Sequence, residues 1–182
     1  MDWRACTRSE TCSIIKEFIT LTPRSKRALL GLLRRHEMQV RKFAWKAPED
    51  DGLWSQFYSN EIETTIGTNM QGRVVDAASA LAAWKPDPDL TGALTLRIDD
   101  AFAPWNSGTW KIAFEYGNVT VSSTHEDPQV FVDIQAFSEA FFGALTPASL
   151  RHRDRLQVHD EAGFHALCHL LAGPPMWAQG FY

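Results

Sequence analysis

The chain has 182 residues, of which 45% are hydrophobic and 12% aromatic, so it can bury a sizeable core and does not have the composition of a disordered protein. No apolar run approaches the roughly 18 residues of a membrane span, and the polar segment MDWRACTRSE is not typical of a signal peptide. Residues 1–46 hold eleven Lys or Arg against four acidic residues, but these cations recur at helical spacing and do not predict nucleic-acid binding. We therefore expect a cytoplasmic protein of one domain, or of one domain with a piece of another.

The first third of the chain predicts a strand, a helix and a second strand. Alternating side chains indicate the strands, and Thr22-Pro23 is the pair that caps and starts a helix. A short acidic segment then favours another helix, because the helix dipole stabilises acids in the first turn. In chain order these are a strand over 13–20, a helix over 23–38, a strand over 40–45 and a short helix over 47–58.

The rest of the chain predicts an antiparallel or mixed sheet with helices on one face, which is an α+β domain. Asp76 is placed to cap a helix, and Gly117-Asn118 predicts a tight turn between two strands. The expected strands span 73–76, 90–99, 108–116, 118–124 and 129–134, and a helix spans 77–84. Two further helices are indicated by apolar stripes, formed by Phe137, Ala140, Phe141 and Leu145 and by Phe164, Leu167, Cys168 and Leu171.

The stretch LTLRIDDAFAPWNSGTW, residues 94–110, combines a strand, an acidic stop, a turn and a return strand. Pro104 restricts its own backbone and that of Ala103, and Asn106 favours a turn. We expect a packed aromatic turn with Trp105 in the core. Neighbouring strand residues point to opposite faces, so the two acids before the turn are expected to cap it rather than to share a proton.

This stretch, together with RVVDAASAL at 73–81, VFVDIQAFSEAFFG at 130–143 and the aromatic chain end, resembles the C-terminal domain of the enhanced intracellular survival (Eis) family. These proteins are GCN5-related N-acetyltransferases (GNATs) whose last domain has a sterol carrier protein-like fold. The resemblance covers roughly residues 14–182. It implies that residues 1–66 end a GNAT-like middle domain and that 67–182 form the sterol carrier protein-like domain.

The resemblance also implies acetyl-CoA as the cofactor of the full-length protein. The family's pyrophosphate pattern is Arg or Gln, two residues, Gly, one residue, then Gly or Ala, and no segment of this chain matches it. Gly67 and Gly72 lie five apart without the Lys-Ser/Thr of a P-loop, which favours an ordinary turn. We therefore expect no cofactor site here, and no activity from this chain alone.

The chain end carries the site that the resemblance implies. In Eis-like enzymes the terminal carboxylate is the base toward the substrate amine, and here that carboxylate belongs to Tyr182, with Phe181 and Trp177 expected to contact substrate. Some aminoglycoside-acetylating members have an acid before the last residue, where this chain has Phe181. The implied partners are the N-terminal acetyltransferase domain, an amine-bearing small molecule or peptide, and further copies of the protein, with no nucleic acid and no membrane.

Two other functions remain open from the residues. The domain could bind an apolar ligand in a tunnel lined by Phe137, Phe141, Phe142 and Trp110, or it could serve as an oligomerisation domain. His165 and His169 lie one helical turn apart, but they lack the Glu of HExxH, so no metal site is expected. The three cysteines have no CxxC spacing, which predicts reduced thiols.

Overall fold

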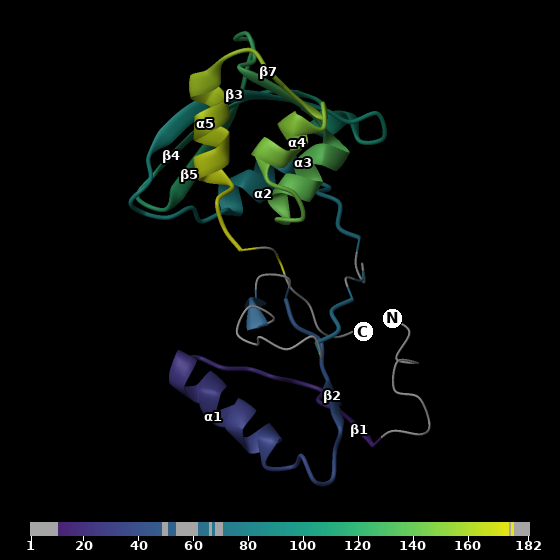
Figure 1. Cartoon of the computed structure of the whole chain (residues 1–182). Helices are drawn as coiled ribbons and strands as arrows, with labels where there is room; N and C mark the ends of the chain where they lie inside the picture. Colours follow the sequence, from purple (N-terminus) through teal and green to yellow (C-terminus); the bar gives the residue numbers. More distant parts are fainter. Residues whose placement is uncertain are drawn as a thin grey trace. The chain divides into compact units, whose positions relative to one another are not determined.

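The fold is α+β, as predicted. The computed structural model describes residues 11–48, 51–53, 62–65, 67, 71–174 and 176. The chain divides into two compact units, Met1–Asn69 with Trp177–Tyr182, and Met70–Met176 (Figure 1). Each unit is described by itself.

The first unit contains the predicted strand, helix and strand. Strand β1 (Cys12–Ile14) pairs in parallel with β2 (Lys42–Ala44), and helix α1 (Pro23–Arg34) connects them. Thr22 caps α1 as expected, because its hydroxyl accepts a hydrogen bond from the Ser25 N–H at 3.1 Å. The elements are shorter than predicted, and most of the expected helix over 47–58 lies outside the described residues.

The expectation of reduced thiols holds for one of the two described cysteines. Cys168 is free, but Cys12 is disulfide-bonded, so the expectation is wrong at this position. The absence of a CxxC motif does not exclude a disulfide, because the bond requires only that the two Cα atoms come within about 7 Å of each other.

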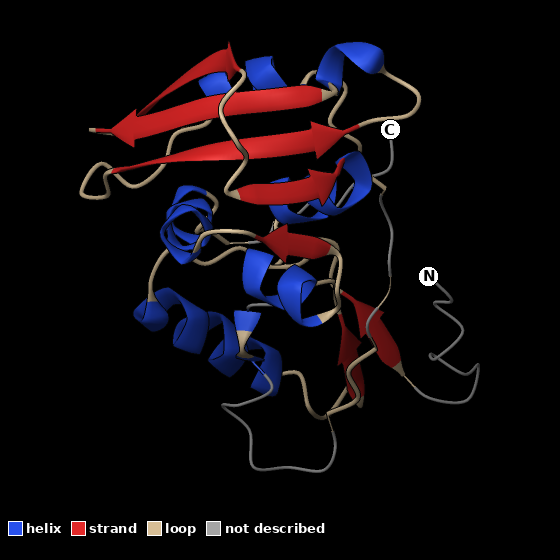
Figure 2. Cartoon of the chain, turned by 90° about the horizontal axis from the view of Figure 1, so that it is seen from above, coloured by secondary structure: helices blue, strands red, loops and turns tan. Residues whose placement is uncertain are grey.

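The second unit is built on a five-stranded mixed sheet with the order β5-β4-β3-β6-β7. Only the central pair, β3 with β6, is parallel. Four of the strands were predicted, whereas β7 was not. Their bounds are β3 Gly92–Asp99, β4 Gly108–Glu115, β5 Asn118–Thr124, β6 Val130–Asp133 and β7 Leu156–Val158. Figure 2 draws the strands as red arrows and the helices in blue.

The tight turn between β4 and β5 lies one residue earlier than predicted. Tyr116 and Gly117 both have positive φ, at 49° and 71°, which is the requirement of a two-residue hairpin turn that matches the strand twist. A strand over 73–76 was also expected, and it does not form. The Val74 N–H donates instead to the Ser138 hydroxyl at 3.0 Å, which removes it from any strand ladder.

The helices of this unit gather on one side of the sheet (Figure 1). Each begins at a side chain that accepts a hydrogen bond from the first turn, namely Asp76, Thr146, Asp133 or Asp160. The short helix α4 was not predicted. The bounds are α2 Ala77–Ala83, α3 Ile134–Phe141, α4 Pro147–His152 and α5 Glu161–Leu170.

The core fills the space between these helices and one face of the sheet. Alternate residues of the central strands, such as Leu96, Ile112 and Val130, are fully buried there, and the predicted stripes of α3 and α5 pack on them. The opposite face is open and polar, with Arg97 and Lys111 exposed. Within the described part of the chain, the structure offers no helix of the length and apolarity that a membrane crossing needs.

Candidate functional site

The loop between β3 and β4 is organised around the buried carboxylate of Asp100. The Arg73 guanidinium donates to both carboxylate oxygens, at 2.6 and 2.7 Å. The backbone N–H groups of Phe102 and Ala103 each donate at 3.0 Å, and the Asn106 amide donates at 2.9 Å. Asp100 therefore caps the turn, as predicted for the pair Asp99-Asp100, whereas the Asp99 carboxylate pairs with Arg97.

These contacts decide the ionisation of Asp100. Burial disfavours the charged form and raises the pKa, but hydrogen bonds from Asn106, Phe102, Ala103 and Arg73 outweigh it and lower the pKa to about 2. The carboxylate is thus ionised at neutral pH and fixed in position. A group with that pKa is a poor proton acceptor, so the site is structural rather than acid–base in character.

Asn106, at the end of the short 3₁₀ helix Pro104–Asn106, joins the loop to helix α2. It is 1% exposed, and its carbonyl oxygen accepts a hydrogen bond from the Ala77 N–H at 2.9 Å. Its amide also donates to the Val75 carbonyl at 3.2 Å. One side chain thereby pairs with two backbone groups of the segment 75–77 and with the Asp100 carboxylate of the loop, which fixes the start of α2 against the loop.

The prediction that Trp105 lies in the core is wrong. Its side chain is 66% exposed, and its indole N–H donates to the Val75 carbonyl at 2.8 Å. The buried position of this turn is Asn106 instead. Sequence reasoning favoured the large aromatic, whereas the structure buries the residue that can pair with three polar groups.

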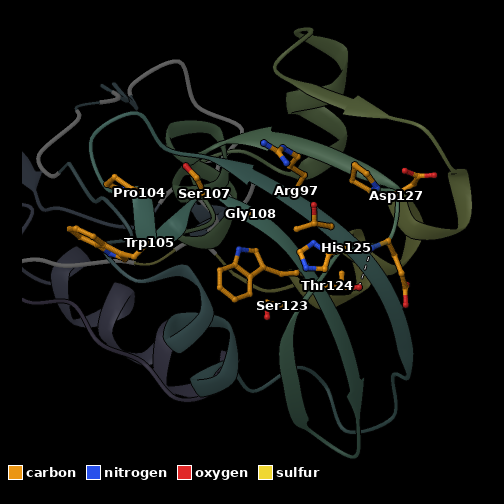
Figure 3. A pocket seen from close by; sticks show the side chains of 13 residues that line it. Arg97, Pro104, Trp105, Ser107, Gly108, Ser123, Thr124, His125 and Asp127 are labelled. Carbon is orange, nitrogen blue, oxygen red and sulfur yellow. Dashed lines mark hydrogen bonds between the residues drawn. The ribbon is translucent and has the colours of Figure 1, made fainter.

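Beside this loop the surface has a hollow of about 560 Å³, at the end of the sheet where β4 begins and β5 ends. Figure 3 shows Trp105 and Pro104 at one side, His125 in the middle and Asp127 at the other side. The hollow is lined by Arg97, Pro104, Trp105, Ser107, Gly108, Thr109, Trp110, Ser123, Thr124, His125, Glu126, Asp127 and Pro128.

The polar side chains of the hollow hold its shape. Ser107 accepts from the Asp100 N–H at 2.9 Å and donates to the Asp100 carbonyl at 3.0 Å, so its hydroxyl is committed to the loop. Lys111 pairs with Glu126 at 2.7 Å, and Arg97 pairs with Asp99 at 3.2 Å. The arrangement suits binding to a surface that combines apolar and polar groups.

The residues expected at the site fall in different places. Tyr182, Phe181 and Trp177 lie outside the described residues. Phe141 contacts both Phe137 and Phe142, with ring centroids 5.9 and 5.6 Å apart, whereas Trp110 belongs to the hollow. Among the residues that the structure describes, no three His, Cys, Asp or Glu side chains form a group that could hold a metal.

Sequence reasoning missed two members of the Asp100 cluster. Arg73 precedes the predicted helix by several residues, and its distance from Asp100 along the chain hid the ion pair. The signal that could have found Asn106 is its position after Pro-Trp, because an Asn in a turn can pair with backbone groups on either side.

Comparison with known proteins places both parts of the chain. Residues 75–179 match the family model of a sterol carrier protein domain, and residues 2–74 match that of an acetyltransferase (GNAT) domain. An uncharacterized N-acetyltransferase of Streptomyces coelicolor is 25% identical over 147 residues, which are 79% of this chain and 35% of that protein. The chain therefore spans about a third of the length of this curated relative.

Two solved structures share the fold. A GCN5-related N-acetyltransferase from Anabaena variabilis superposes with a TM-score of 0.83 at 22% identity, over 97% of this chain and 45% of that chain. Eis1 from Mycobacterium abscessus superposes with a TM-score of 0.77 at 19% identity, over 97% of this chain and 44% of that one. The chain belongs to the sterol carrier protein domain family, and an acetyltransferase (GNAT) segment precedes that domain.

Proposed function

We propose that this chain is the C-terminal part of an Eis-like N-acetyltransferase, in which it packs against the catalytic domain and helps to shape the pocket for the acceptor amine. The observation that carries the proposal is the direct succession of the two family matches, 2–74 and 75–179, within one chain. The division into a GNAT-like part over 1–66 and a sterol carrier-like part over 67–182 is part of the proposal.

The first unit supports a role within a larger domain. Its described sheet has only two strands, and an isolated two-stranded sheet is at best marginally stable in water. Helix α1 has no buried residue, and Ile14 and Met38 are exposed in the segments around it. Further acetyltransferase sequence would supply the strands and the core that such a helix and sheet require.

The described helices do not fit acetyl-CoA. A pyrophosphate needs free backbone N–H groups at a helix start, usually in a glycine-rich loop. Here the starts of α2, α3 and α5 are each occupied by an aspartate side chain, and those of α1 and α4 by a threonine. Three of these caps are anionic and would repel a phosphate. The proposal therefore assigns acetyl-CoA to the part of the protein outside this chain.

The proposed contribution to catalysis is the terminal carboxylate of Tyr182, acting as the base toward the amine, with Phe181 and Trp177 beside the substrate. A terminal carboxylate is ionised at neutral pH, and partial desolvation would raise its pKa toward that of a useful base. The resemblance to the Eis family supports this assignment. We further propose a cytoplasmic homo-oligomer that acts on an amine-bearing small molecule or peptide.

Isothermal titration calorimetry with acetyl-CoA tests whether the cofactor site lies outside residues 1–182. Residues 1–182 alone should give no saturable heat at micromolar concentrations and no acetyl transfer to amines. The longer protein, with the acetyltransferase sequence that its relatives carry, should give both. Micromolar binding or turnover by residues 1–182 alone would contradict the proposal, because it would require a cofactor site within this chain.

A further inference from the structure

Three apolar side chains of the second unit lie exposed beside the Asp100 cluster. Val75 is 68% exposed, Phe102 83% and Trp105 66%. Trp105 and Val75 are neighbours in space, because the Trp105 indole N–H donates to the Val75 carbonyl. Phe102 lies in the same loop as Trp105, and the centre of its ring is 5.9 Å from the Arg73 guanidinium. We call Val75, Phe102 and Trp105 the apolar patch.

The backbone at Phe102 and the indole of Trp105 are anchored by hydrogen bonds. Phe102 donates its N–H to Asp100, and Trp105 sits between Pro104 and the buried Asn106. The charge of Asp100 is neutralised by Arg73, so the surface beside the rings carries no unpaired ion from this cluster. Aromatic residues and arginine that are fixed before binding are typical anchors of protein interfaces, because little conformational entropy is lost on contact.

The apolar patch also lies where the two family matches meet. The acetyltransferase match ends at residue 74 and the sterol carrier match begins at 75, and the patch starts at this junction. A partner domain of the same polypeptide is held at high effective concentration relative to this surface. About two thirds of the curated relative lies outside the matched region, so the sequence that could cover the patch is long.

We infer that the apolar patch and the hollow beside Trp105 together form the docking surface for the part of the acetyltransferase that lies outside this chain. The inference rests on the proposed function and adds the residues of the contact. The partner presents an apolar face to Phe102 and Trp105, and a protruding segment enters the hollow between Trp105 and Trp110. Docking through this patch fixes the sterol carrier domain relative to the catalytic domain.

Fluorine NMR of protein labelled with fluorotryptophan tests this surface. The chain has seven tryptophans, and Trp105→Phe assigns the Trp105 signal. In residues 1–182 alone, exchange of H₂O for D₂O should shift the Trp105 signal strongly. In the longer protein the shift should fall by at least half. An unchanged shift would overturn the inference, and so would protection in residues 1–182 that grows with concentration, since the occupant would then be a second copy.

Two variants of the longer protein make the test specific. Phe102→Ser should restore solvent access to Trp105, whereas Tyr116→Ser should not, although Tyr116 is 77% exposed at the far end of β4. Unchanged signals from the other tryptophans show that each variant is folded. Acetyl transfer by the unaltered longer protein is measured separately. Absent transfer with a protected Trp105 would reject the proposed function alone, whereas normal transfer with an exposed Trp105 would reject the docking surface alone.

Discussion

Gly163 lies so close to Gln129 that a Cβ atom at position 163 would stand 2.5 Å from the Gln129 Cβ. Gln129 in turn accepts a hydrogen bond from the Thr95 N–H at 2.9 Å and donates to the Asp160 carboxylate at 2.6 Å. The glycine thus lets the first turn of α5 approach the strand β3 through a single side chain. No larger residue fits there without movement of Gln129.

Gly163→Ala should therefore lower the free energy of unfolding by about 1–3 kcal/mol, the usual cost of overpacking. Urea denaturation of both proteins measures the difference. Gly31→Ala is the matched control, because a Cβ at position 31 meets no atom within 4 Å. In helix α1 the added methyl group should stabilise the protein by up to about 1 kcal/mol. Equal effects at the two positions would contradict the packing argument.

The Asp100 carboxylate should be far more important for stability than its neighbour in the chain. Asp100→Asn removes the charge that faces Arg73 and should cost about 3 kcal/mol, because a cation is left beside a buried neutral amide. Asp99→Asn breaks only the exposed pair with Arg97 and should cost less than about 1 kcal/mol. Chemical denaturation at neutral pH compares them, and similar losses would show that Asp100 is not the organising group.

The lowered pKa of Asp100 predicts an acid-dependent loss of stability. Because the folded pKa is about 2 and the unfolded value is near 3.8, the stabilisation is fully present above about pH 4 and declines as the pH falls toward 2. Its size is on the order of 2 kcal/mol. Denaturation midpoints at several pH values should show the difference between the unaltered protein and Asp100→Asn becoming smaller across this range. A constant difference would exclude the linkage.

Within the Pro-Trp-Asn turn, the polar residue should contribute more to stability than the aromatic one. Asn106→Ala leaves the Ala77 N–H without its acceptor and removes one of the donors to Asp100, which should cost about 2–4 kcal/mol. In residues 1–182, Trp105→Ala should cost less than about 1 kcal/mol, since the ring is mostly exposed. Thermal melts followed by circular dichroism provide both values. The reverse order would restore Trp105 to the core.

The proposed terminal base predicts an effect of chain extension on rate. In the longer protein a C-terminal tag after Tyr182 should reduce kcat by about 10²–10⁴-fold, as loss of a general base does. Tyr182→Phe keeps the carboxylate and the ring, so it should retain most activity. Steady-state kinetics with the tag verified by mass spectrometry tests this. A tagged enzyme with normal kcat would exclude the terminal carboxylate as the base.

The meander β3-β4-β5 could be predicted because its signals are local. Each strand alternates apolar and polar residues, and short turns separate the strands. The alternation therefore predicts which side chains face the core without knowledge of the rest of the chain. Strand β7 has only three residues, of which Leu156 alone is buried. Three residues are too few to show an alternation of apolar and polar side chains. Its pairing with β6 is decided by tertiary contacts.

The candidate site was less accessible to prediction, because its partners are distant in sequence. The acidic cap of the turn was expected at Asp99-Asp100, but Arg73 lies 27 residues before Asp100. The exposure of Trp105 depends on where α2 and residue 75 pack, and no local pattern contains that information. The chemical role of single residues could be predicted from the sequence, whereas their burial and their partners depend on the fold.

The parallel pairing of β3 with β6 has a consequence for how the second unit folds. The β3-β4-β5 meander closes through short connections, but β6 returns to β3 only after the whole hairpin has been traversed. Loop-closure entropy makes such a non-local pairing late. We expect the meander to order first and the segment from Val130 onward to join it at the rate-limiting step, so that a change in the turn at Tyr116-Gly117 slows folding more than it speeds unfolding.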